Sequence, residues 1–333
     1  MDILHTIYEK AKQAPKVVAF PEAENEKVMQ AAYETTVDGY IRALLVGDVP
    51  HLKQLCEERG YDPEVFQFEA MGDASRIEEL VTQYTSLPGT LLGPKGLTRR
   101  MADPLTYCLV LEALGVCDVT FAGIDYPTGD VILAGQTIVG LQEGISTISS
   151  IGIFDIPGYE GSEGQYLVFG DSAVCQNPTA EQLSDIAISA CNTVRTLLDW
   201  EPRCALVSYS TLGSGTGELL DKVIEAAKIA REKRPDLAIE GEFQLDAAID
   251  PEVAKKKVQT ESRVAGRANI VIWPDLNVGN VGVKLVQQFA HADAYGPMLQ
   301  GFRKVVCDCS RGAPVSELKG NIVISAVRAA GME

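Results

Sequence analysis

The chain has 333 residues, with 46 acidic and 29 basic side chains, and its formal net charge is −17. This length exceeds that of a typical single core and indicates two domains of roughly 150 residues each. The acidic balance argues against a broad contact with a DNA or RNA backbone, which needs a basic face. An anionic ligand must therefore be bound by a few local cations and backbone amides.

The sequence shows neither a membrane span nor a secretion signal. No apolar run approaches the ~20 residues that cross a bilayer, and the start, "MDILHTIYEKAKQAPK", lacks the zones of a signal peptide. We therefore expect a cytoplasmic protein. The eight cysteines are scattered and mostly flanked by apolar residues, which predicts reduced core thiols. Cys307 and Cys309 form the one close pair, and with three histidines in the chain we expect no metal site.

Strand-like apolar runs alternate with helical patterns along the chain. In chain order, the strand and helix pairs are 16–20 with 24–39, 42–47 with 49–60, 204–210 with 218–233, and 269–275 with 281–292. This alternation predicts parallel sheets covered by helices, with ligands beyond the carboxyl ends of the strands.

A segment rich in glycine and serine, residues 145–170, interrupts the alternation. We interpret it as a crossing between domains rather than a packed element, and place the boundary near residue 150. The predicted domains are 1–150 plus about 305–333, and 151–304. The C-terminal segment is thus expected to return to the first domain.

A glycine-rich turn follows a β-type run in "ALVSYSTLGSGTGELLDKV", residues 205–223. Backbone amides at the start of the following helix, with glycines that allow close approach, favour a phosphate site. The stretch matches neither the P-loop nor the dinucleotide-binding fingerprint. It can equally be only a turn.

Two further motifs begin helices. Thr179, with Gln182 three residues later, predicts a capping box ahead of an amphipathic helix. Asn280 and Lys284 lie near the start of a helix that follows a buried strand. On an exposed face such a lysine is either a ligand contact or simply solvated.

The last motif is "CDCSRGAPVSE", residues 307–317. Pro314 is favoured in the first turn of a helix, which places Ser310 and Arg311 in the preceding loop and Glu317 about one turn inside the helix. A planar guanidinium, a helix start and a nearby carboxylate can bind a phosphate and supply a base. The alternative is a capped terminal helix with Arg311 on the surface.

Several motifs together resemble the phosphate acetyl/butyryl transferase family. They are, in this order, "NPTAEQL", "STLGSGTG", "EGEFQLDAAIDPEVA", "VAGRANIVIWPDLNVGNVGVKLVQ", "GPMLQGF" and "CSRG". The likeness is close from about 170 to 313, and weaker before that through "FPEAENEKVMQAA" and "DPLTYCLVLEALGVCDVTFAG". It implies two three-layer α/β domains with mostly parallel sheets and an interdomain cleft, an architecture like that of isocitrate and isopropylmalate dehydrogenases. It also implies a homodimer that exchanges an acyl group between phosphate and coenzyme A (CoA), with CoA as co-substrate, no permanently bound cofactor and no metal.

The resemblance also implies the site residues. Ser310 and Arg311 match the serine and arginine that contact phosphate and developing charge, and Glu317 stands where the family has its proposed aspartate base. The implied substrate-binding residues are Thr128, Asp130, Thr211, Gly213, Ser214, Gly215, Asn280, Lys284, Gln300 and Gly312.

Two positions depart from the family pattern. Leu133 stands where an arginine is expected, and leucine also stands near position 92. Both arginines are associated in the family with CoA; the exposed-looking cations Lys95, Arg99 and Arg100 are close enough in sequence to replace them. The departures leave two alternatives beside the acyltransferase: an impaired family member with a ligand-binding or regulatory role, and an acyltransferase with another thiol acceptor. The acyl chain length stays open.

Overall fold

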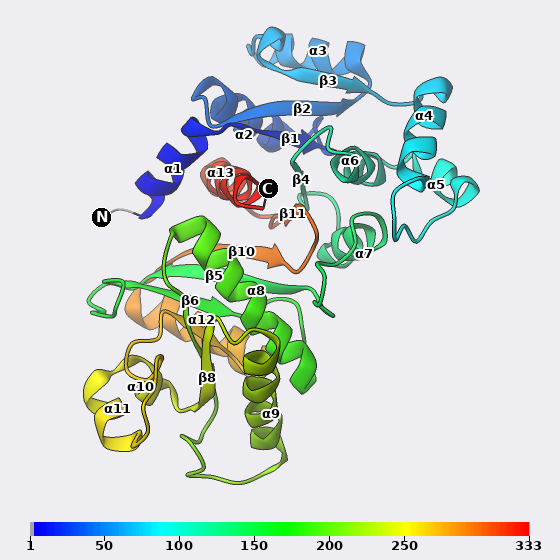
Figure 1. Cartoon of the computed structure of the whole chain (residues 1–333). Coiled ribbons are helices and arrows are strands. Elements are labelled where there is room, and N and C mark those ends of the chain that lie inside the picture. Colours follow the sequence, from blue (N-terminus) through cyan, green and yellow to red (C-terminus); the bar gives the residue numbers. More distant parts are fainter. Residues whose placement is uncertain (1–2, 333) are drawn as a thin grey trace. The chain divides into compact units, whose positions relative to one another are not determined.

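The computed structural model describes residues 3–332. The chain separates into two compact units: unit 1 is Met1–Leu141 with Phe302–Glu333, and unit 2 is Gln142–Gly301. From the sequence, these divisions were expected near 150 and 304. Each unit contains one sheet (Figure 1). Among residues 3–332, no helix has both the length and the apolar character needed to cross a membrane.

The sheet of unit 1 has five strands, and every pair is parallel. In spatial order they are β11 (Val305–Asp308), β4 (Val119–Ala122), β1 (Lys16–Phe20), β2 (Ile41–Gly47) and β3 (Gln67–Ala70). Because the strands are parallel, the carboxyl ends of β1, β4 and β11 meet at one edge of the sheet.

The helices of unit 1 cover both faces of this sheet. They are α1 (Ile3–Gln13), α2 (Glu26–Val37), α3 (Val49–Glu58), η1 (Pro63–Val65), α4 (Ala74–Thr85), α5 (Pro94–Arg100), α6 (Pro104–Ala113), α7 (Thr128–Ile138) and α13 (Val315–Ala330). Helices α2, α3 and α13 pack on one face, where Val28, Leu52 and Leu318 belong to one buried cluster with the strands. Leu318 and Ile322 of α13 are fully buried, and burial of such a side chain is worth ~1.5–3 kcal/mol. This docking fixes the loop that leads into α13.

The sheet of unit 2 has six strands. In spatial order they are β10 (Asp293–Gln300), β5 (Ser149–Asp155), β6 (Tyr166–Gly170), β9 (Ile270–Ile272), β7 (Arg203–Val207) and β8 (Ala238–Phe243). Four of them, β6, β9, β7 and β8, are parallel, and β5 runs antiparallel to both of its neighbours.

The interpretation of residues 145–170 as an unpacked crossing is wrong. This segment contains β5 and β6, and residues 149–154 are all buried. Its glycines and serines allow tight packing on both faces: a Cβ on Gly152 would lie 3.0 Å from the ring of Phe154. Small residues here reflect close packing rather than a loop.

The helices of unit 2 also lie on both faces of its sheet. They are α8 (Ala180–Leu198), α9 (Glu218–Lys233), α10 (Leu245–Ile249), α11 (Pro251–Lys257) and α12 (Leu276–Ala290). The capping box predicted at the start of α8 is confirmed: the Thr179 hydroxyl accepts from the Gln182 N–H, and the Gln182 side chain accepts from the Thr179 N–H.

The predicted alternation of strands and helices is confirmed in both units. The expected pairs correspond to β1 with α2, β2 with α3, β7 with α9, and β9 with α12. All eight cysteines are free; seven are buried and Cys175 is partly buried. The two-sheet α/β fold expected from the sequence is therefore the fold observed.

Candidate active site

The candidate residues of unit 1 gather at the carboxyl ends of three neighbouring strands. The loops there follow β1, β4 and β11, and two of them lead directly into α7 and α13 (Figure 1). The predicted residues at this edge are Thr128, Asp130, Ser310, Arg311, Gly312 and Glu317. Unit 1 thus carries six of the thirteen predicted site residues.

Glu22, in the loop after β1, binds the backbone of the loop after β4 at this edge. Its carboxylate is 7% exposed and accepts hydrogen bonds from the backbone N–H groups of Ile124, Asp125 and Tyr126, at 3.2, 2.6 and 2.9 Å. The buried charge is therefore satisfied by three donors of the loop after β4. Glu22 was not among the residues predicted from the sequence. The feature that could have indicated it is an acidic residue two positions after a buried strand.

Asp308, the last residue of β11, joins that strand to the start of α7. The Thr128 hydroxyl donates to its Oδ2 at 2.7 Å. Its Oδ1 is buried and has no hydrogen-bond partner among residues 3–332. Gly123 lies against this carboxylate: its φ is +109°, and a Cβ there would overlap Asp308 and lie 2.5 Å from the Cys309 nitrogen. Only glycine therefore allows β4 and β11 to end in this way.

The loop from Cys309 to Pro314 connects β11 to α13 and carries the predicted phosphate contacts. The Cys309 N–H donates to the Ala122 carbonyl at 2.9 Å, the Ala313 N–H to the Ser310 carbonyl at 2.9 Å, and the Lys27 ammonium to the Ala313 carbonyl at 3.2 Å. The loop is thus held at both ends while Ser310 itself is exposed.

Arg311 is exposed in the middle of this loop, and no carboxylate among residues 3–332 pairs with it. In a chain of net charge −17, an unpaired guanidinium ahead of a helix start is chemically suited to contact an anion. The helix begins at Val315, with Pro314 as its N-cap, one residue later than expected.

Glu317 lies in the first turn of α13, is exposed, and has no side-chain hydrogen-bond partner within the described part of the chain. Burial raises the pKa of the nearby Cys309 thiol, and the charges of Glu22, Asp308 and Glu317 raise it further. These effects keep the Cys309 thiol protonated. Cys309 is consequently a packing residue rather than a nucleophile.

In unit 2, the predicted phosphate loop after β7 is held by a carboxylate of the protein. Glu242, 3% exposed at the end of β8, accepts from the Gly213 N–H at 2.6 Å and from the Ser210 hydroxyl at 3.0 Å. The Gly215 N–H donates to the Ser210 Oγ at 2.9 Å. Two amides of the expected cradle are thus already engaged within unit 2.

The other predicted residues of this loop are also bonded inside unit 2. Thr211 is buried; its N–H donates to the Ser214 Oγ, and its own Oγ1 accepts from the Gln244 N–H, both at 3.0 Å. The phosphate site expected at this loop stays a prediction.

Two candidates on α12 are exposed. The Asn280 amide donates to the Ser172 carbonyl at 3.3 Å, and Lys284 donates to Gln287 at 3.2 Å. Gln300, in contrast, is 2% exposed: its amide donates to the Ser149 Oγ and accepts from the Thr193 hydroxyl. Gln300 thus links α8 to the sheet. A contact of Gln300 with a substrate stays a prediction.

A model of the family described as phosphate acetyl/butaryl transferase matches residues 2–326. The chain belongs to this family. It is 38% identical to "Phosphate acetyltransferase" of Clostridium acetobutylicum over 99% of each chain. The solved structure of "EutD phosphotransacetylase from Staphylococcus aureus" is 28% identical, with a TM-score of 0.89 over 98% of each chain. The predicted family is therefore confirmed.

A more distant structure shares the fold alone. It is "a putative 4-hydroxythreonine-4-phosphate dehydrogenase" from Salmonella typhimurium, 10% identical, with a TM-score of 0.53 over 94% of this chain and 99% of the other. This likeness agrees with the dehydrogenase-like architecture that the sequence predicts.

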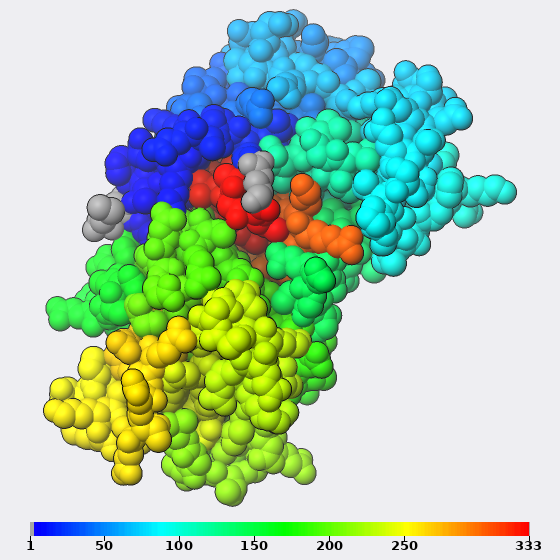
Figure 2. Space-filling model, in the orientation of Figure 1, coloured from blue at the N-terminus to red at the C-terminus, as the bar shows by residue number. Residues whose placement is uncertain are grey.

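The two leucines that stand where the resemblance predicts arginines differ in exposure. Leu133 is 63% exposed on α7, and Leu92 is partly buried ahead of α5. Lys95, Arg99 and Arg100 are exposed on α5. This helix belongs to the cyan region of Figure 2. Arg99 donates through Nε to the Lys95 carbonyl of the same helix. These cations therefore have room to reach a ligand but are not held toward one.

The electrostatics of the transferase site predict a pH effect centred on Asp308. Burial raises the pKa of Asp308 to about 6; the charge of Glu22 adds to this effect, and the hydrogen bond from Thr128 opposes it. Since an unfolded aspartate has a pKa of ~3.9, folding favours the protonated form, and the stability this gives is lost as the pH rises through about 6.

We expect kcat/KM to fall as the pH drops below about 6, because a proton on Asp308 weakens its bond with Thr128 at the start of α7. A profile measured between about pH 5 and 8 should show this acidic limb in the wild type and lose it in Asp308→Asn. A limb that persists unchanged in the variant would assign the titration to another group.

Proposed function

We propose that this chain is a phosphate acyltransferase that exchanges an acetyl or other short acyl group between an acyl phosphate and CoA. The observation that carries the proposal is the exposed Ser310–Arg311–Gly312 loop at the start of α13, in a chain that the family model matches from 2 to 326. Its ligands are acyl phosphate, inorganic phosphate and CoA as co-substrate, and none of the proposed steps needs a metal. The eight free cysteines fit a protein that acts in the cytoplasm.

The reaction needs a base, stabilisation of charge on phosphate and carbonyl oxygens, and alignment of two substrates. The CoA thiol gives its proton to Glu317, and the thiolate sulfur forms a bond to the acyl carbon. The bond from that carbon to the phosphate oxygen breaks, and the electron pair leaves with inorganic phosphate. Arg311 and the amides at the start of α13 stabilise the phosphate charge, while the Ser310 hydroxyl donates to oxygen charge that develops.

Other residues of both units position substrates in this proposal. Thr128 is exposed at the start of α7 and donates its proton to Asp308, and Asp130 is exposed in the first turn of α7. In unit 2, Lys284 and Asn280 offer a cation and an amide on the exposed face of α12. These groups suit the phosphates and amides of CoA.

A panel of acyl phosphates and acceptors tests the proposal. Acyl-CoA formation is measured with acetyl, propionyl and butyryl phosphate, and with CoA, dephospho-CoA and pantetheine as thiols. We expect turnover with acetyl phosphate and CoA. Turnover with pantetheine but not with CoA would show that the acceptor is a thiol other than CoA. Phosphate binding without any turnover would support the regulatory alternative.

We also propose that the protein is a homodimer. Four side chains on α12, at helical spacing, are exposed although apolar: Val278 (43%), Val281 (58%), Leu285 (50%) and Phe289 (81%). Single exposed apolar residues are ordinary, but a continuous stripe of this kind is typical of a surface that another chain covers. A second copy of this chain can supply the same stripe about a twofold axis.

Phe289→Glu should convert the proposed dimer to a monomer, because two buried carboxylates would meet near the axis. Sedimentation equilibrium is expected to give twice the chain mass for the wild type and one chain mass for the variant. Val37→Glu is the matched control, since Val37 is 59% exposed on α2 of the other unit and should leave the dimer intact. A wild type that sediments as a monomer at micromolar concentration contradicts the proposal.

A further inference from the structure

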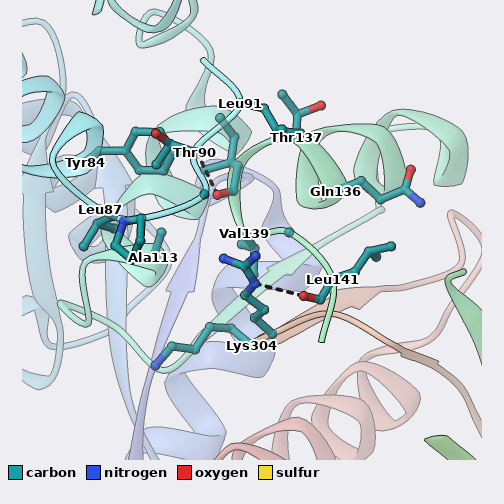
Figure 3. Close-up of a pocket in the computed structure, with 15 residues that line it drawn as sticks. Tyr84, Leu87, Thr90, Leu91, Ala113, Gln136, Thr137, Val139, Leu141 and Lys304 are labelled. Carbon is teal, nitrogen blue, oxygen red and sulfur yellow. Dashed lines mark hydrogen bonds between the residues drawn. The ribbon is translucent and has the colours of Figure 1, made fainter. Parts of the chain in front are cut away.

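A pocket in unit 1 lies outside the residues assigned above. Its volume is about 490 Å³, and its walls come from the end of α4 with the segment after it, from the end of α7 with residues 139–141, and from the connection before β11 (Figure 3). Ligand pockets for small organic molecules usually measure ~300–1,000 Å³. The space is therefore large enough for one such molecule.

The charged side chains that line this pocket are both cationic. They are Arg303 and Lys304, and no aspartate or glutamate is among the lining residues. The one other ionisable side chain is Tyr84, which donates its proton to the Ile138 carbonyl at 2.8 Å and whose pKa is raised by burial. The pocket is thus positively charged in a protein with a net charge of −17.

Arg303 is held in place by its backbone and by one side-chain nitrogen. Its N–H donates to the Gly140 carbonyl at 3.0 Å, and its Nε donates to the Leu141 carbonyl at 2.9 Å. Cβ atoms built on Gly89 and Gly140 would lie 3.4 Å from the guanidinium, so the two glycines border it closely. Within residues 3–332 no carboxylate pairs with Arg303, and its two terminal nitrogens are left for a ligand.

Lys304, the second cation, interacts electrostatically with the carboxyl of Glu112. Glu112 is fully buried, and burial raises its pKa to about 8, so it carries a proton at pH 7 and does not neutralise the lysine.

The rest of the wall is largely apolar. It includes Leu87, Pro88, Leu91, Val139 and Leu141. Figure 3 shows Lys304 on the opposite side from Leu91 and Thr137. An anion bound by the two cations would therefore place an apolar or aromatic body against these side chains.

We infer that this pocket binds the phosphate group of an organic phosphate whose body is a flat ring, of the size of an adenine nucleotide. A planar guanidinium fork suits a phosphate monoester, the ammonium of the next residue in the chain adds positive charge to the same pocket, and the apolar wall suits the base. The same chemistry has two sources: the 3′-phosphoadenosine end of CoA, and a free nucleotide that acts as an effector.

The test uses adenosine 3′-phosphate as the probe, with calorimetric titration of the intact protein. We expect saturable binding to the wild type and a dissociation constant at least about tenfold higher in the double variant Arg303→Gln/Lys304→Gln. Arg42→Gln/Lys53→Gln is the matched control: it removes the same charge from unit 1 at residues that do not line the pocket. Arg303→Lys keeps the charge but loses the fork, and should bind with intermediate affinity. No binding to the wild type, or equal binding by the double variant and the wild type, would overturn the inference.

Steady-state kinetics then distinguish CoA from a free nucleotide as the ligand. This second experiment alone rests on the proposed transferase activity. If the ligand is CoA, the double variant should raise KM for CoA and leave KM for dephospho-CoA unchanged. If it is a free effector, KM for CoA should be unchanged, and the probe should alter the wild-type rate without competing with CoA. Either pattern supports the pocket. Binding of the probe without any turnover would contradict the proposed function but would still support the inference that the pocket binds an organic phosphate.

Discussion

Replacing Glu317 by Gln is expected to lower kcat by about 10²–10⁴-fold and to leave phosphate binding nearly unchanged. The amide keeps the shape of the side chain but cannot take the proton of the CoA thiol. A carboxylate is a weaker base than a thiolate, so it helps only where the thiolate is stabilised as the proton leaves. In the proposed mechanism, Arg311 and the amides at the start of α13 provide this stabilisation. Rates at saturating acetyl phosphate and CoA, with phosphate inhibition measured in parallel, check this result.

Glu317→Asp is the sharper companion variant. It shortens the side chain by one methylene, and a displacement of ~1 Å can cost about a hundredfold in rate. Because α13 is docked by fully buried residues such as Leu318 and Ile322, the helix cannot easily move to compensate. We therefore expect activity to fall. A Glu317→Gln enzyme that equals the wild type at every pH would make Glu317 a helix-capping residue and Asp308, then Asp130, the next candidates for the base.

Arg311→Ala is expected to raise the apparent constants for acetyl phosphate and inorganic phosphate by about one to two orders of magnitude, which corresponds to the ~1.5–3 kcal/mol of a charge-assisted contact. The loss falls on binding because Arg311 is exposed and its guanidinium has no carboxylate partner within residues 3–332. KM for acetyl phosphate and the inhibition constant of phosphate measure the effect. Arg231→Ala, at an exposed arginine of α9, is the control, and unchanged constants for Arg311→Ala would remove this residue from the site.

Much of the fold was predictable because its signals are local. The runs that form β1, β7 and β9 are short and apolar, and amphipathic patterns follow each of them. The strands β5 and β6 were not predictable in the same way. Their residues include several glycines and serines. β5 pairs antiparallel with β6 and with β10, which lies more than a hundred residues later in the sequence, and β6 also pairs with the distant β9.

The same distinction between local and distant signals applies to the candidate site. Ser310, Arg311 and Glu317 belong to one contiguous motif, so their role could be proposed from the sequence. The bonds that shape the site join distant residues: Glu22 with Asp125 across 103 positions, and Thr128 with Asp308 across 180. The glycine-rich loop shows the converse, because its local pattern indicates a phosphate cradle while Glu242, 29 positions from Gly213, occupies one of its amides.

Exchange of labelled inorganic phosphate into acetyl phosphate is the measurement that tests the central claim most directly. The reaction as proposed is reversible and passes through acetyl-CoA, so label should enter acetyl phosphate only when CoA is present. We predict rapid CoA-dependent exchange by the wild type, and exchange reduced by at least about a hundredfold in the double variant Arg311→Ala/Glu317→Gln. Exchange without CoA, or the same rate in the double variant, would contradict the assignment of acyl transfer to the loop at the start of α13.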